Sequence, residues 1–528
     1  MRARAATRYT AAMFSVPAPR SRPGLGVLVP AIRLPKDYAR VDELRRLAAN
    51  GVAGFLVFGG DRELLPPLLD SLREAAGRPL LIMTDAECGM GQQVEGCLRL
   101  PPLMAVGAAL SEERAYEHGR VTALEARAVG VNMVLAPVAD VLSRATNPII
   151  GARSFGANPE TVAALTAAWI AGAQDQGVLA CAKHFPGHGD TEKDSHEDLP
   201  VVGADRETIE RRELVPFRAA VRAGVGAVMT AHVAYPALDP TPRLPASLSA
   251  PILRGLLRDD VGFGGLVLSD ALIMAGLLAA GDGDEPLSEA EAAVRCVEAG
   301  CDLLLYPADT EACATALEAA AATGRIDLGA IDGRLGLTLA DLIVDSPDVR
   351  ALEPDHVYDA YGLARDGITA IRDDANLLPV KRRPGDAVMA LLVDDDDDAA
   401  REQAFRRSGH VFRGGLVRLT DWSGDDADPL LSLVEGADHV VLAVACSQRA
   451  WKGRPGLRPS LARLVEAVVR RTRGRALCLL LGSPGVLHDV SPQPPTLVSA
   501  WGDAPVSVRA ALDVLLGGHP MRGLDPAP

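Results

Sequence analysis

Histidine, lysine and acidic side chains are concentrated in one stretch, Lys183 to His196, which reads KHFPGHGDTEKDSH. Proline and glycine predict an irregular loop here, and the loop carries three histidines and three acidic residues. One chemistry that these residues allow is proton transfer, in which Asp194 orients His196 as an acid and base. The other is metal binding, for which the available ligands are His184, His188, Asp190 and His196.

Lys183 bears on the choice between these two chemistries, because it stands directly before His184. A fixed ammonium group repels a divalent cation, which counts against a metal at this position. A carbamylated lysine can itself bind a metal, so the spacing alone leaves metal binding open as the minor alternative. A loop with only a structural role is the remaining interpretation.

A second candidate for chemistry is Asp270, in the stretch LSDALIM at 268–274. It closes a short apolar run, where an aspartate can either cap a following helix or act as a carboxylate nucleophile. Because the Lys183–His196 loop already indicates an acid and base, we favour the nucleophile.

Both sites need strands that bring them together, and the chain from Leu25 to about Pro307 has the pattern of such strands. Eight short apolar runs alternate with longer stretches of helical spacing, several of which end at glycine. Unbroken apolarity predicts strands buried on both faces, as in a parallel sheet. Their number and spacing predict a (β/α)8 barrel, with an open doubly wound sheet as the alternative. The runs cover residues 25–32, 52–60, 79–85, 131–140, 178–186, 225–233, 265–272 and 301–307.

Ionisable residues stand at the ends of five of these runs. Catalytic groups of such barrels come from the carboxyl ends of the strands, so these side chains would meet at one rim. Their coincidence predicts an active site there, rather than isolated helix caps or core histidines. The residues are Asp85, Asp140, Lys183 with His184, His232 and Asp270.

The rest of the chain predicts a smaller second domain. We expect a flexible leader at 1–23, the barrel at 24–345, a linker at 346–360 and an α/β sandwich domain at 361–528. The acidic run Asp394 to Asp398 is expected to be a solvated loop rather than a metal site. In the second domain, apolar runs predict four strands, at 387–395, 439–447, 475–484 and 495–502.

Composition excludes several classes of protein. Of the 528 residues, 48% are hydrophobic and 23% are charged, which indicates a sizeable core and excludes disorder as the main state. The formal net charge of -15 disfavours nucleic acid and anionic membranes as partners. Eight scattered cysteines without a C-x-x-C pair predict reduced thiols. No membrane-spanning run and no signal-peptide pattern is evident, so we expect a cytoplasmic enzyme.

These stretches together resemble glycoside hydrolase family three, in its bacterial β-N-acetylglucosaminidase branch. The resemblance rests on KHFPGHGDTEKDSH and SDALIM, on NPIIGARSFGANPE at 147–160, on TDAECG at 84–89, and on MTAHVAYPALDP followed by PASLS. It extends over about residues 25–345, and the chain from about residue 361 resembles the second domain of longer members.

The resemblance implies a retaining, exo-acting β-N-acetylglucosaminidase that acts on peptidoglycan- or chitin-derived fragments through a covalent glycosyl-enzyme. It implies Asp270 as the nucleophile and His196, paired with Asp194, as the acid and base. It also implies a small carbohydrate substrate, with no cofactor and no metal. The residues that it implies for holding the sugar are Asp85, Arg153, Lys183, His184, His232 and Met274.

One loop departs from the family pattern. After Asp85 the family reads D-x-E-G-G-R-V-x-R, whereas this chain has Cys88 for a glycine and Met90 and Gln93 for the two arginines. We therefore expect altered contacts and looser discrimination at the sugar. A β-glucosidase or a β-glycoside phosphorylase of the same family, and a non-catalytic sugar-binding homologue, stay open as alternatives. The phosphorylase is suggested because a histidine, unlike a carboxylate, does not repel a phosphate acceptor.

Overall fold

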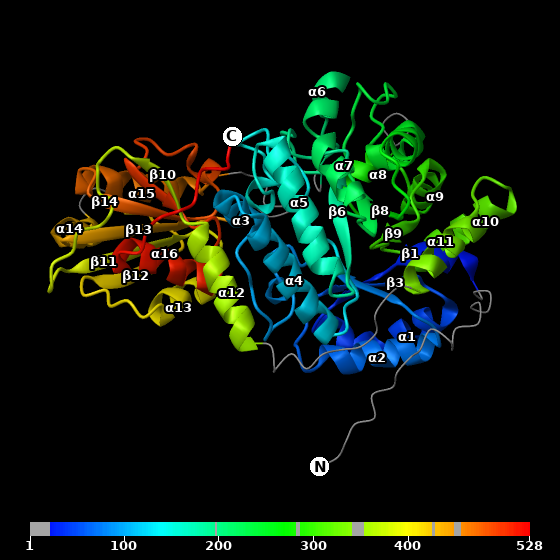
Figure 1. The fold of residues 1–528 in the computed structure, drawn as a ribbon, viewed down its shortest axis with the longest axis horizontal. Helices are drawn as coiled ribbons and strands as arrows, with labels where there is room; N and C mark the ends of the chain where they lie inside the picture. Colours follow the sequence, from blue (N-terminus) through cyan, green and yellow to red (C-terminus); the bar gives the residue numbers. More distant parts are fainter. Residues whose placement is uncertain (1–21, 196–197, 281–285, 341–352, 425–427, 448–455) are drawn as a thin grey trace, which may run out of the picture.

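The eight apolar runs form the strands of a parallel barrel (Figure 1) in the computed structural model, which describes residues 22–195, 198–280, 286–340, 353–424, 428–447 and 456–528. Pro30 divides the first run into β1 and β2, so β1 pairs with β9, β2 pairs with β3, and the ring closes. Proline has no N–H to donate, but its carbonyl oxygen still accepts a hydrogen bond from the Leu56 amide (3.0 Å). The predicted barrel is confirmed. Its strands are β1 (Leu28–Val29), β2 (Ala31–Arg33), β3 (Gly54–Phe58), β4 (Leu81–Thr84), β5 (Met133–Val134), β6 (Leu179–Phe185), β7 (Ala227–Thr230), β8 (Leu266–Ala271) and β9 (Leu303–Leu305).

Side chains fill the barrel interior. Apolar residues of the strands, among them Leu81, Met133 and Leu303, pack on one another inside the ring. A second, larger core lies between the strands and the surrounding helices. Burial on both faces of each strand accounts for the unbroken apolarity of the runs. The helices around the barrel are α1 (Val41–Asn50), α2 (Leu65–Ala76), α3 (Leu103–Ala109), α4 (Glu112–Ala128), α5 (Pro159–Gln174), α6 (Arg206–Arg211), α7 (Leu214–Arg222), a π-type helix (Pro251–Asp260), α8 (Ala275–Leu278), α9 (Glu289–Ala299), α10 (Thr310–Ala322) and α11 (Leu328–Ala340).

Helix boundaries follow the local sequence. The side chains of Ser111 and Asn158 accept hydrogen bonds from the amides of Arg114 and Thr161, so they cap the amino ends of α4 and α5. Helix α1 ends at Gly51, whose φ of 111° is a conformation that favours glycine. The chain can therefore leave α1 and enter β3 within a few residues, as the glycine predicts.

The second unit is a six-stranded sheet with helices on both faces (Figure 1). All neighbouring strands are parallel except β10 and β15. Helices α13 and α16 cover one face of the sheet, and α14 and α15 cover the other. The predicted α/β sandwich is confirmed. In sheet order the strands are β10 (Thr369–Asp373), β15 (Thr496–Ser499), β14 (Ala476–Leu481), β13 (His439–Ala445), β11 (Val388–Asp394) and β12 (Gly415–Leu419), and the helices are α13 (Ala399–Arg407), α14 (Pro429–Gly436), α15 (Pro459–Thr472) and α16 (Pro505–Gly517).

Two strands of this sheet, β10 and β12, lie outside the four runs predicted from the sequence. Both are edge strands. Every residue of β12 is only half-buried, and β10 is likewise mostly half-buried or exposed. Edge strands lack the unbroken apolarity of buried parallel strands, which is the pattern that identified the other four.

The segment between the units is helical in its second part. Part of the predicted linker at 346–360 lies outside the described residues, but from residue 353 the chain forms α12 (Glu353–Asp366). This helix packs against α3, α4 and α16, and Asp366 pairs with Arg114 of α4 (2.7 Å). The part of the predicted linker at 353–360 is thus helical, since a proline near the start of a segment is compatible with the first turn of a helix. Residues 1–21 of the predicted leader lie outside the described residues.

The last residues return from the second sheet to the barrel. The Leu524 amide donates to the Ala108 carbonyl of α3 (2.9 Å), and the Pro526 carbonyl accepts from the Ala157 amide (2.8 Å). Figure 1 shows this end of the chain between the two units, beside α3 and α5. We call residues 523–526 the C-terminal strap.

The acidic run at 394–398 begins inside the protein. Asp394 and Asp395 are only 0% and 5% exposed, and each pairs with an arginine. The prediction of a solvated loop is therefore wrong for these two residues. The central cation is Arg401, which is 2% exposed. One of its partners, Asp503 (2.6 Å), also pairs with Arg99 of the barrel (2.7 Å). This arrangement, named the Arg401 cluster below, comprises Arg401 with Asp394, Asp396 and Asp503.

All eight cysteines are free thiols, as predicted, and six of them are buried. Among the helices of the described residues, none is long and apolar enough to cross a membrane.

Candidate active site

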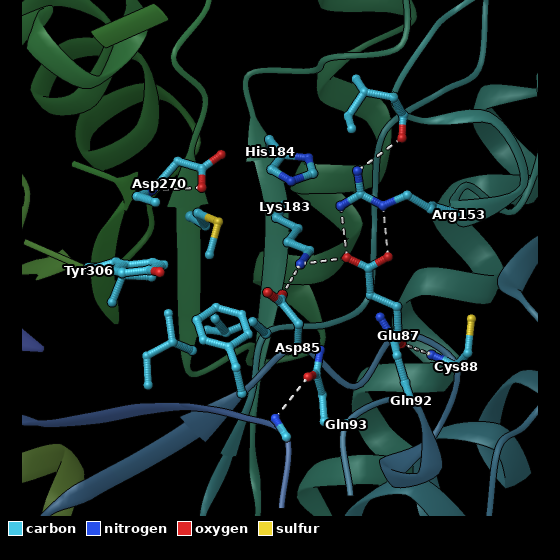
Figure 2. A pocket seen from close by; sticks show the side chains of 18 of the residues that line it. Asp85, Glu87, Cys88, Gln92, Gln93, Arg153, Lys183, His184, Asp270 and Tyr306 are labelled. Atoms are coloured by element: carbon cyan, nitrogen blue, oxygen red, sulfur yellow. Dashed lines mark hydrogen bonds and ion pairs between the residues drawn. The ribbon is translucent and has the colours of Figure 1, made fainter. Parts of the chain in front are cut away.

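A cavity of about 880 Å³ lies at the carboxyl ends of the barrel strands. Its floor is apolar, because Leu56, Leu135, Met229 and Leu305 line it and also belong to the core inside the ring. Ser447 of the second unit completes the wall. The cavity is therefore closed below, at the position where barrel enzymes hold their substrates. Figure 2 shows its interior.

Four charged side chains occupy one region of the cavity (Figure 2). Lys183 Nζ, at the end of β6, lies 2.6 Å from Asp85 Oδ1 and 2.6 Å from Glu87 Oε1. Arg153 binds the Glu87 carboxylate through Nε and Nη2, each at 2.8 Å. Lys183 and Glu87 are buried, whereas the Asp85 side chain is 29% exposed, so Asp85 is the acid that a ligand can reach. We name this set the Glu87 cluster; its members are Asp85, Glu87, Arg153 and Lys183.

The members of the Glu87 cluster hold one another in the charged state. Burial alone would raise the pKa of Glu87, but Arg153 and Lys183 outweigh burial and keep the pKa of Glu87 below its usual range. Burial alone would lower the pKa of Lys183, but Asp85 and Glu87 raise it above its ordinary value. Fixed charged donors and acceptors side by side suit a neutral polyol, whose adjacent hydroxyl groups both donate and accept.

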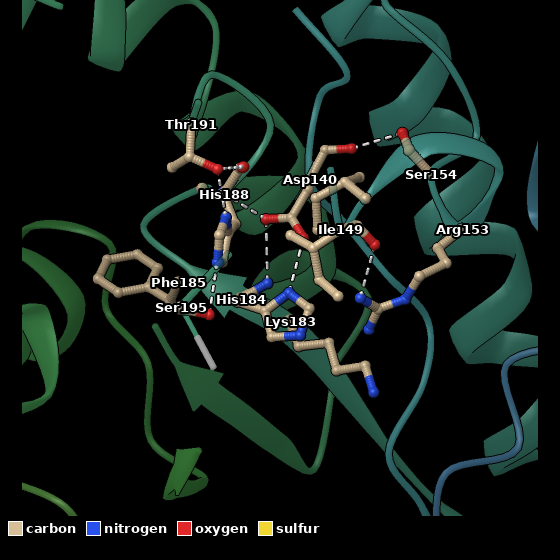
Figure 3. Close-up of polar contacts among 12 residues, drawn as sticks. Asp140, Ile149, Arg153, Ser154, Lys183, His184, Phe185, His188, Thr191 and Ser195 are labelled. Carbon is tan, nitrogen blue, oxygen red and sulfur yellow. Dashed lines mark hydrogen bonds and ion pairs between the residues drawn. The ribbon is translucent and has the colours of Figure 1, made fainter. Parts of the chain in front are cut away.

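His184 is oriented by a buried aspartate (Figure 3). Asp140 Oδ2 lies 2.8 Å from His184 Nδ1, and Asp140 Oδ1 accepts from the backbone amide of His188 (2.7 Å). Burial alone would raise the pKa of Asp140, but His184 and His188 bring it below its usual value. Because the carboxylate is ionised and can only accept, His184 Nδ1 carries a proton. The other ring nitrogen, Nε2, is then available to a ligand in the cavity that His184 lines.

The loop after β6 is held in place by His188. Its Nδ1 is 2.9 Å from Thr191 Oγ1, and its Nε2 is 3.0 Å from Ser195 Oγ (Figure 3). Burial lowers the pKa of His188 to about 4, so the ring is neutral at neutral pH. Gly189 packs so closely that a Cβ there would lie 1.7 Å from the Val141 carbonyl oxygen. The glycine and the histidine therefore fix the loop so that Ser195 lines the cavity.

The described part of this loop does not form a metal centre. Asp190, one of the possible ligands, pairs instead with Arg144 (3.3 Å) and Arg212 (2.7 Å). Among the described residues, no three His, Cys, Asp or Glu side chains are placed to hold a metal ion. His196, the last of the possible ligands, lies outside the described residues.

Asp270 stands at the end of β8, across the cavity from Arg153 and Glu87 (Figure 2). It is half-buried, and its Oδ1 accepts a hydrogen bond from the Ala271 amide (2.7 Å). The structure thus brings Asp270, Asp85, Arg153, Lys183 and His184 to one cavity.

The remaining part of the predicted machinery is the acid and base. Asp194 is 7% exposed and directly precedes Ser195 of the cavity wall. Because His196 lies outside the described residues, its role and its pairing with Asp194 stay predictions.

His232 and Met274, predicted to hold the sugar, lie behind the wall rather than in it. His232 is fully buried, with Nδ1 2.8 Å from Ser247 Oγ and Nε2 3.2 Å from the Ala271 carbonyl oxygen. Met274 is 1% exposed. His232 thus contacts the backbone directly beside Asp270.

The loop that departs from the family pattern is divided between core and cavity. Met90 is fully buried in the larger core between the strands and the surrounding helices and does not line the cavity, so the altered sugar contacts expected there do not fall on it. Gln93 lines the cavity, and its Oε1 accepts from the Gly59 amide (3.3 Å). Gln92 lines it too and accepts from the Cys88 amide (2.7 Å). Two neutral amides thus form this part of the wall.

Glu87 and Tyr306 line the site but are absent from the predicted set. Glu87 stands two positions after Asp85, within the TDAECG stretch, so its spacing places it in the same loop. Asp140 is visible in the sequence as a strand-end acid, but its partner His184 is known only from the fold. Tyr306 follows β9 within an apolar run that carries no mark of a ligand site.

Known proteins resemble this chain over both of its units. The model of the family Glycosyl hydrolase family 3 N terminal domain matches residues 36–336. A β-hexosaminidase of Thiobacillus denitrificans is 42% identical over 274 residues, which cover 50% of this chain and 74% of that protein. A Cellulomonas fimi protein named Beta-N-acetylglucosaminidase/beta-glucosidase is 29% identical over 494 residues, 86% of this chain and 85% of that protein. The solved glycoside hydrolase family 3 β-N-acetylglucosaminidase of Paenibacillus sp. str. FPU-7 has a TM-score of 0.83 at 29% identity, covering 97% of this chain and 99% of that one.

Proposed function

Because this chain belongs to glycosyl hydrolase family 3 and is a glycosidase, we propose that it is a retaining, exo-acting β-N-acetylglucosaminidase. In this proposal its substrates are peptidoglycan- or chitin-derived fragments that end in β-linked N-acetylglucosamine. The observation that carries the proposal is the arrangement in Figure 2, where Asp270 lies on one side of a closed cavity and the Glu87 cluster on the other.

The shape of the cavity supports the exo mode. Its floor is the packed interior of the barrel, so a saccharide can enter only from the rim. The sugar that reaches Asp270 is then the one at the end of the chain, and the rest of the substrate stays toward the rim.

The chemistry follows from the position of Asp270. Its carboxylate attacks the anomeric carbon, forming a glycosyl ester as the bond to the leaving oxygen breaks. In our proposal His196, oriented by Asp194, protonates that oxygen and afterwards takes a proton from the water that attacks the ester. Histidine titrates near neutral pH, so it can perform both transfers.

The Glu87 cluster and His184 hold the sugar while this happens. Asp85 can accept from one hydroxyl group while Lys183 donates to its neighbour, and both are already fixed by their ion pair (2.6 Å). Arg153 and Glu87 form the rigid support behind them. Because the charges are paired before the sugar arrives, little reorganisation is needed on binding.

The names of the relatives bear on the choice of sugar. The Thiobacillus denitrificans relative is a β-hexosaminidase and supports an amino sugar. The Cellulomonas fimi relative, which matches 86% of this chain, is named for both β-N-acetylglucosaminidase and β-glucosidase activity. β-Glucosidase activity is therefore the second candidate, and the neutral Gln92 and Gln93 in the wall are consistent with a less selective pocket.

Paired 4-nitrophenyl β-glycosides that differ only at C2 test the proposal, each assayed with and without phosphate. We expect the N-acetylglucosaminide to be preferred by about tenfold or more in kcat/KM, because the pocket must distinguish the substituent at C2. The first-formed sugar, followed by NMR, should keep the β configuration. Preference for the glucoside would favour the second candidate, and a sugar 1-phosphate as the main product would replace hydrolysis by phosphorolysis.

A further inference from the structure

Arg33 and Tyr306 form a pair in the cavity wall that the proposed mechanism does not use. Arg33 ends β2 and Tyr306 directly follows β9, on adjacent parts of the barrel. The guanidinium carbon of Arg33 lies 4.7 Å from the centre of the Tyr306 ring, and both side chains line the cavity. A cation over an aromatic face at this distance is held by the negative charge of the ring face.

The Tyr306 backbone is in a conformation that bulky residues rarely adopt. Its φ of 54° lies in the left-handed region. The ring is further held by Phe58, at 5.6 Å between ring centres, and by a hydrogen bond from the Tyr306 amide to the Val29 carbonyl (2.9 Å). Strained backbone of this kind is concentrated at binding and catalytic sites. The strain here presents a flat aromatic surface on which the arginine lies.

Among the described residues, Arg33 differs from the other cations of the cavity in its partners. Lys183 and Arg153 are both bound to Glu87, and Arg99 pairs with Asp503 (2.7 Å). For Arg33, no carboxylate of the described residues lies within ion-pair distance. The acid next to it, Asp37, accepts instead from the Arg33 backbone amide (2.7 Å). The Arg33 guanidinium therefore faces the cavity with its hydrogen-bond donors available.

We propose that Arg33, held over Tyr306, is a subsite for an oxyanion carried by the substrate or the acceptor. Figure 2 shows Tyr306 on the side of Asp270, away from Arg153 and Glu87. The subsite therefore meets the part of the reactants that the Glu87 cluster does not hold. A guanidinium binds carboxylate and phosphate oxygens through two parallel donors, and the ring beneath it limits its rotamers before binding.

The oxyanion has two possible sources, and both rest on the proposed function. One is a carboxylate on the leaving group. The other is inorganic phosphate as the acceptor, whose oxygen would attack the anomeric carbon of the glycosyl ester. In that step an ionised phosphate oxygen forms a new C–O bond to the anomeric carbon, the C–O bond to Asp270 breaks, and Asp270 leaves as a carboxylate with the bonding electrons, so no proton is transferred.

The leaving-group source is tested with 4-carboxyphenyl and 4-carbamoylphenyl β-N-acetylglucosaminides, which are close in size and differ in charge. Arg33→Met should lower kcat/KM for the carboxylate substrate by roughly tenfold to a hundredfold, the range for hydrogen bonds to charged groups. The amide substrate should change less than about twofold, which also shows that the variant is folded. For Arg33→Lys, kcat/KM for the carboxylate substrate should lie between the values for the unmodified enzyme and Arg33→Met, because lysine keeps the charge but lacks the two parallel donors of the guanidinium group. The matched control is Arg45→Met, which removes a charge from the exposed face of α1.

The phosphate source is tested by measuring sugar 1-phosphate formation from the neutral amide substrate as phosphate is varied. Arg33→Met should raise the KM for phosphate by roughly tenfold or more if phosphate occupies the subsite. A selective effect in either assay supports the proposal and identifies the source. The proposal would be overturned if Arg33→Met, like Arg45→Met, left unchanged both the ratio of kcat/KM for the carboxylate and amide substrates and the KM for phosphate.

The test separates this inference from the proposed function. If the unmodified enzyme does not cleave the neutral N-acetylglucosaminide, the proposed function has failed. The ratio of kcat/KM for the carboxylate and amide leaving groups can then be measured on the corresponding glucosides, and its change in Arg33→Met still tests the role of Arg33.

Discussion

Replacing Glu87 by glutamine tests whether a residue that contacts no substrate in our proposal nevertheless sets the geometry of the site. Glutamine has nearly the same shape, but it removes the charge that binds Lys183 (2.6 Å) and two of the guanidinium nitrogens of Arg153, Nε and Nη2 (2.8 Å each). After the change, Lys183 still has Asp85, whereas Arg153 keeps the Ile149 carbonyl (3.0 Å). The side-chain NH2 group of glutamine would also point a hydrogen-bond donor at a donor of Lys183 or Arg153.

The expected loss of stability follows from the burial of this pair. The Glu87 side chain is 5% exposed, and removing one partner of a buried ion pair costs about 3–5 kcal/mol. At roughly 1.5 °C per kcal/mol for a unit of the size of the barrel, Tm should fall by about 4 °C or more. The difference should stay constant from pH 6 to 8, because the pKa of Glu87 is below its usual value in the folded chain and the usual value of 4.5 in the unfolded chain also lies well below pH 6. A displaced Arg153 should lower kcat/KM by about a hundredfold.

Thermal melting and steady-state kinetics on a neutral aryl β-N-acetylglucosaminide measure both effects. Glu113→Gln, on the exposed first turn of α4, is the matched control and should change neither. Asp85→Asn provides the contrast, because Asp85 is partly exposed and should lose activity with little change in Tm. If Glu87→Gln melted within about 1 °C of the parent and kept its kcat/KM, the Glu87 cluster would not organise the site.

Four further outcomes are expected. Asp270→Asn should leave Tm unchanged and lose more than about nine-tenths of kcat, since an amide cannot form the glycosyl ester; a smaller loss would exclude it as the nucleophile. His196→Ala should spare an activated aryl glycoside, which azide should then accelerate, and nearly abolish cleavage of a disaccharide; equal losses on both would contradict an acid and base role. His118 has its pKa lowered by burial to about 4 from 6.5, so the unfolded chain takes up the proton first and stability should fall between pH 6.5 and 4, by about 2 kcal/mol at pH 5, a loss absent in His118→Gln. Asp503→Asn should lower Tm, because it leaves buried Arg401 short of a partner, and it should speed proteolysis between the units, because it breaks the ion pair with Arg99 of the barrel. Unchanged proteolysis would mean that this ion pair does not hold the units together.

The fold can be predicted from the sequence wherever a hydrophobic pattern repeats, and the features that the sequence did not predict have a physical cause. Buried parallel strands such as β3 and β14 are apolar throughout, so they can be recognised without tertiary information. The edge strand β12 is half-buried at every position and has no such mark. The acidic run at 394–398 illustrates a different limit, because its burial depends on Arg401 and on Asp503, more than a hundred positions later in the chain.

The candidate site shows the same division. Residues at strand ends, such as Asp85, Lys183 and Asp270, can be placed at the rim once the barrel is predicted. Whether a residue there faces the cavity or the core depends on side-chain direction, which the sequence does not specify. Met90 and His232 are accordingly in the core or behind the wall, although their positions in the sequence put them at the rim.

The C-terminal strap has a consequence for the time at which activity can begin during synthesis. The segment that carries Arg153 is bound through Ala157 to Pro526, and Arg99 at the rim is bound to Asp503. Chains emerge from the ribosome amino end first, at roughly 5–20 residues per second, so residue 526 follows residue 270 by about 13–51 s. During that interval a nascent barrel already has Asp270 and the Glu87 cluster in its sequence but lacks the contacts that fix their surroundings. Full activity should therefore arise only after residues 523–526 have been made and the second unit has folded onto the barrel.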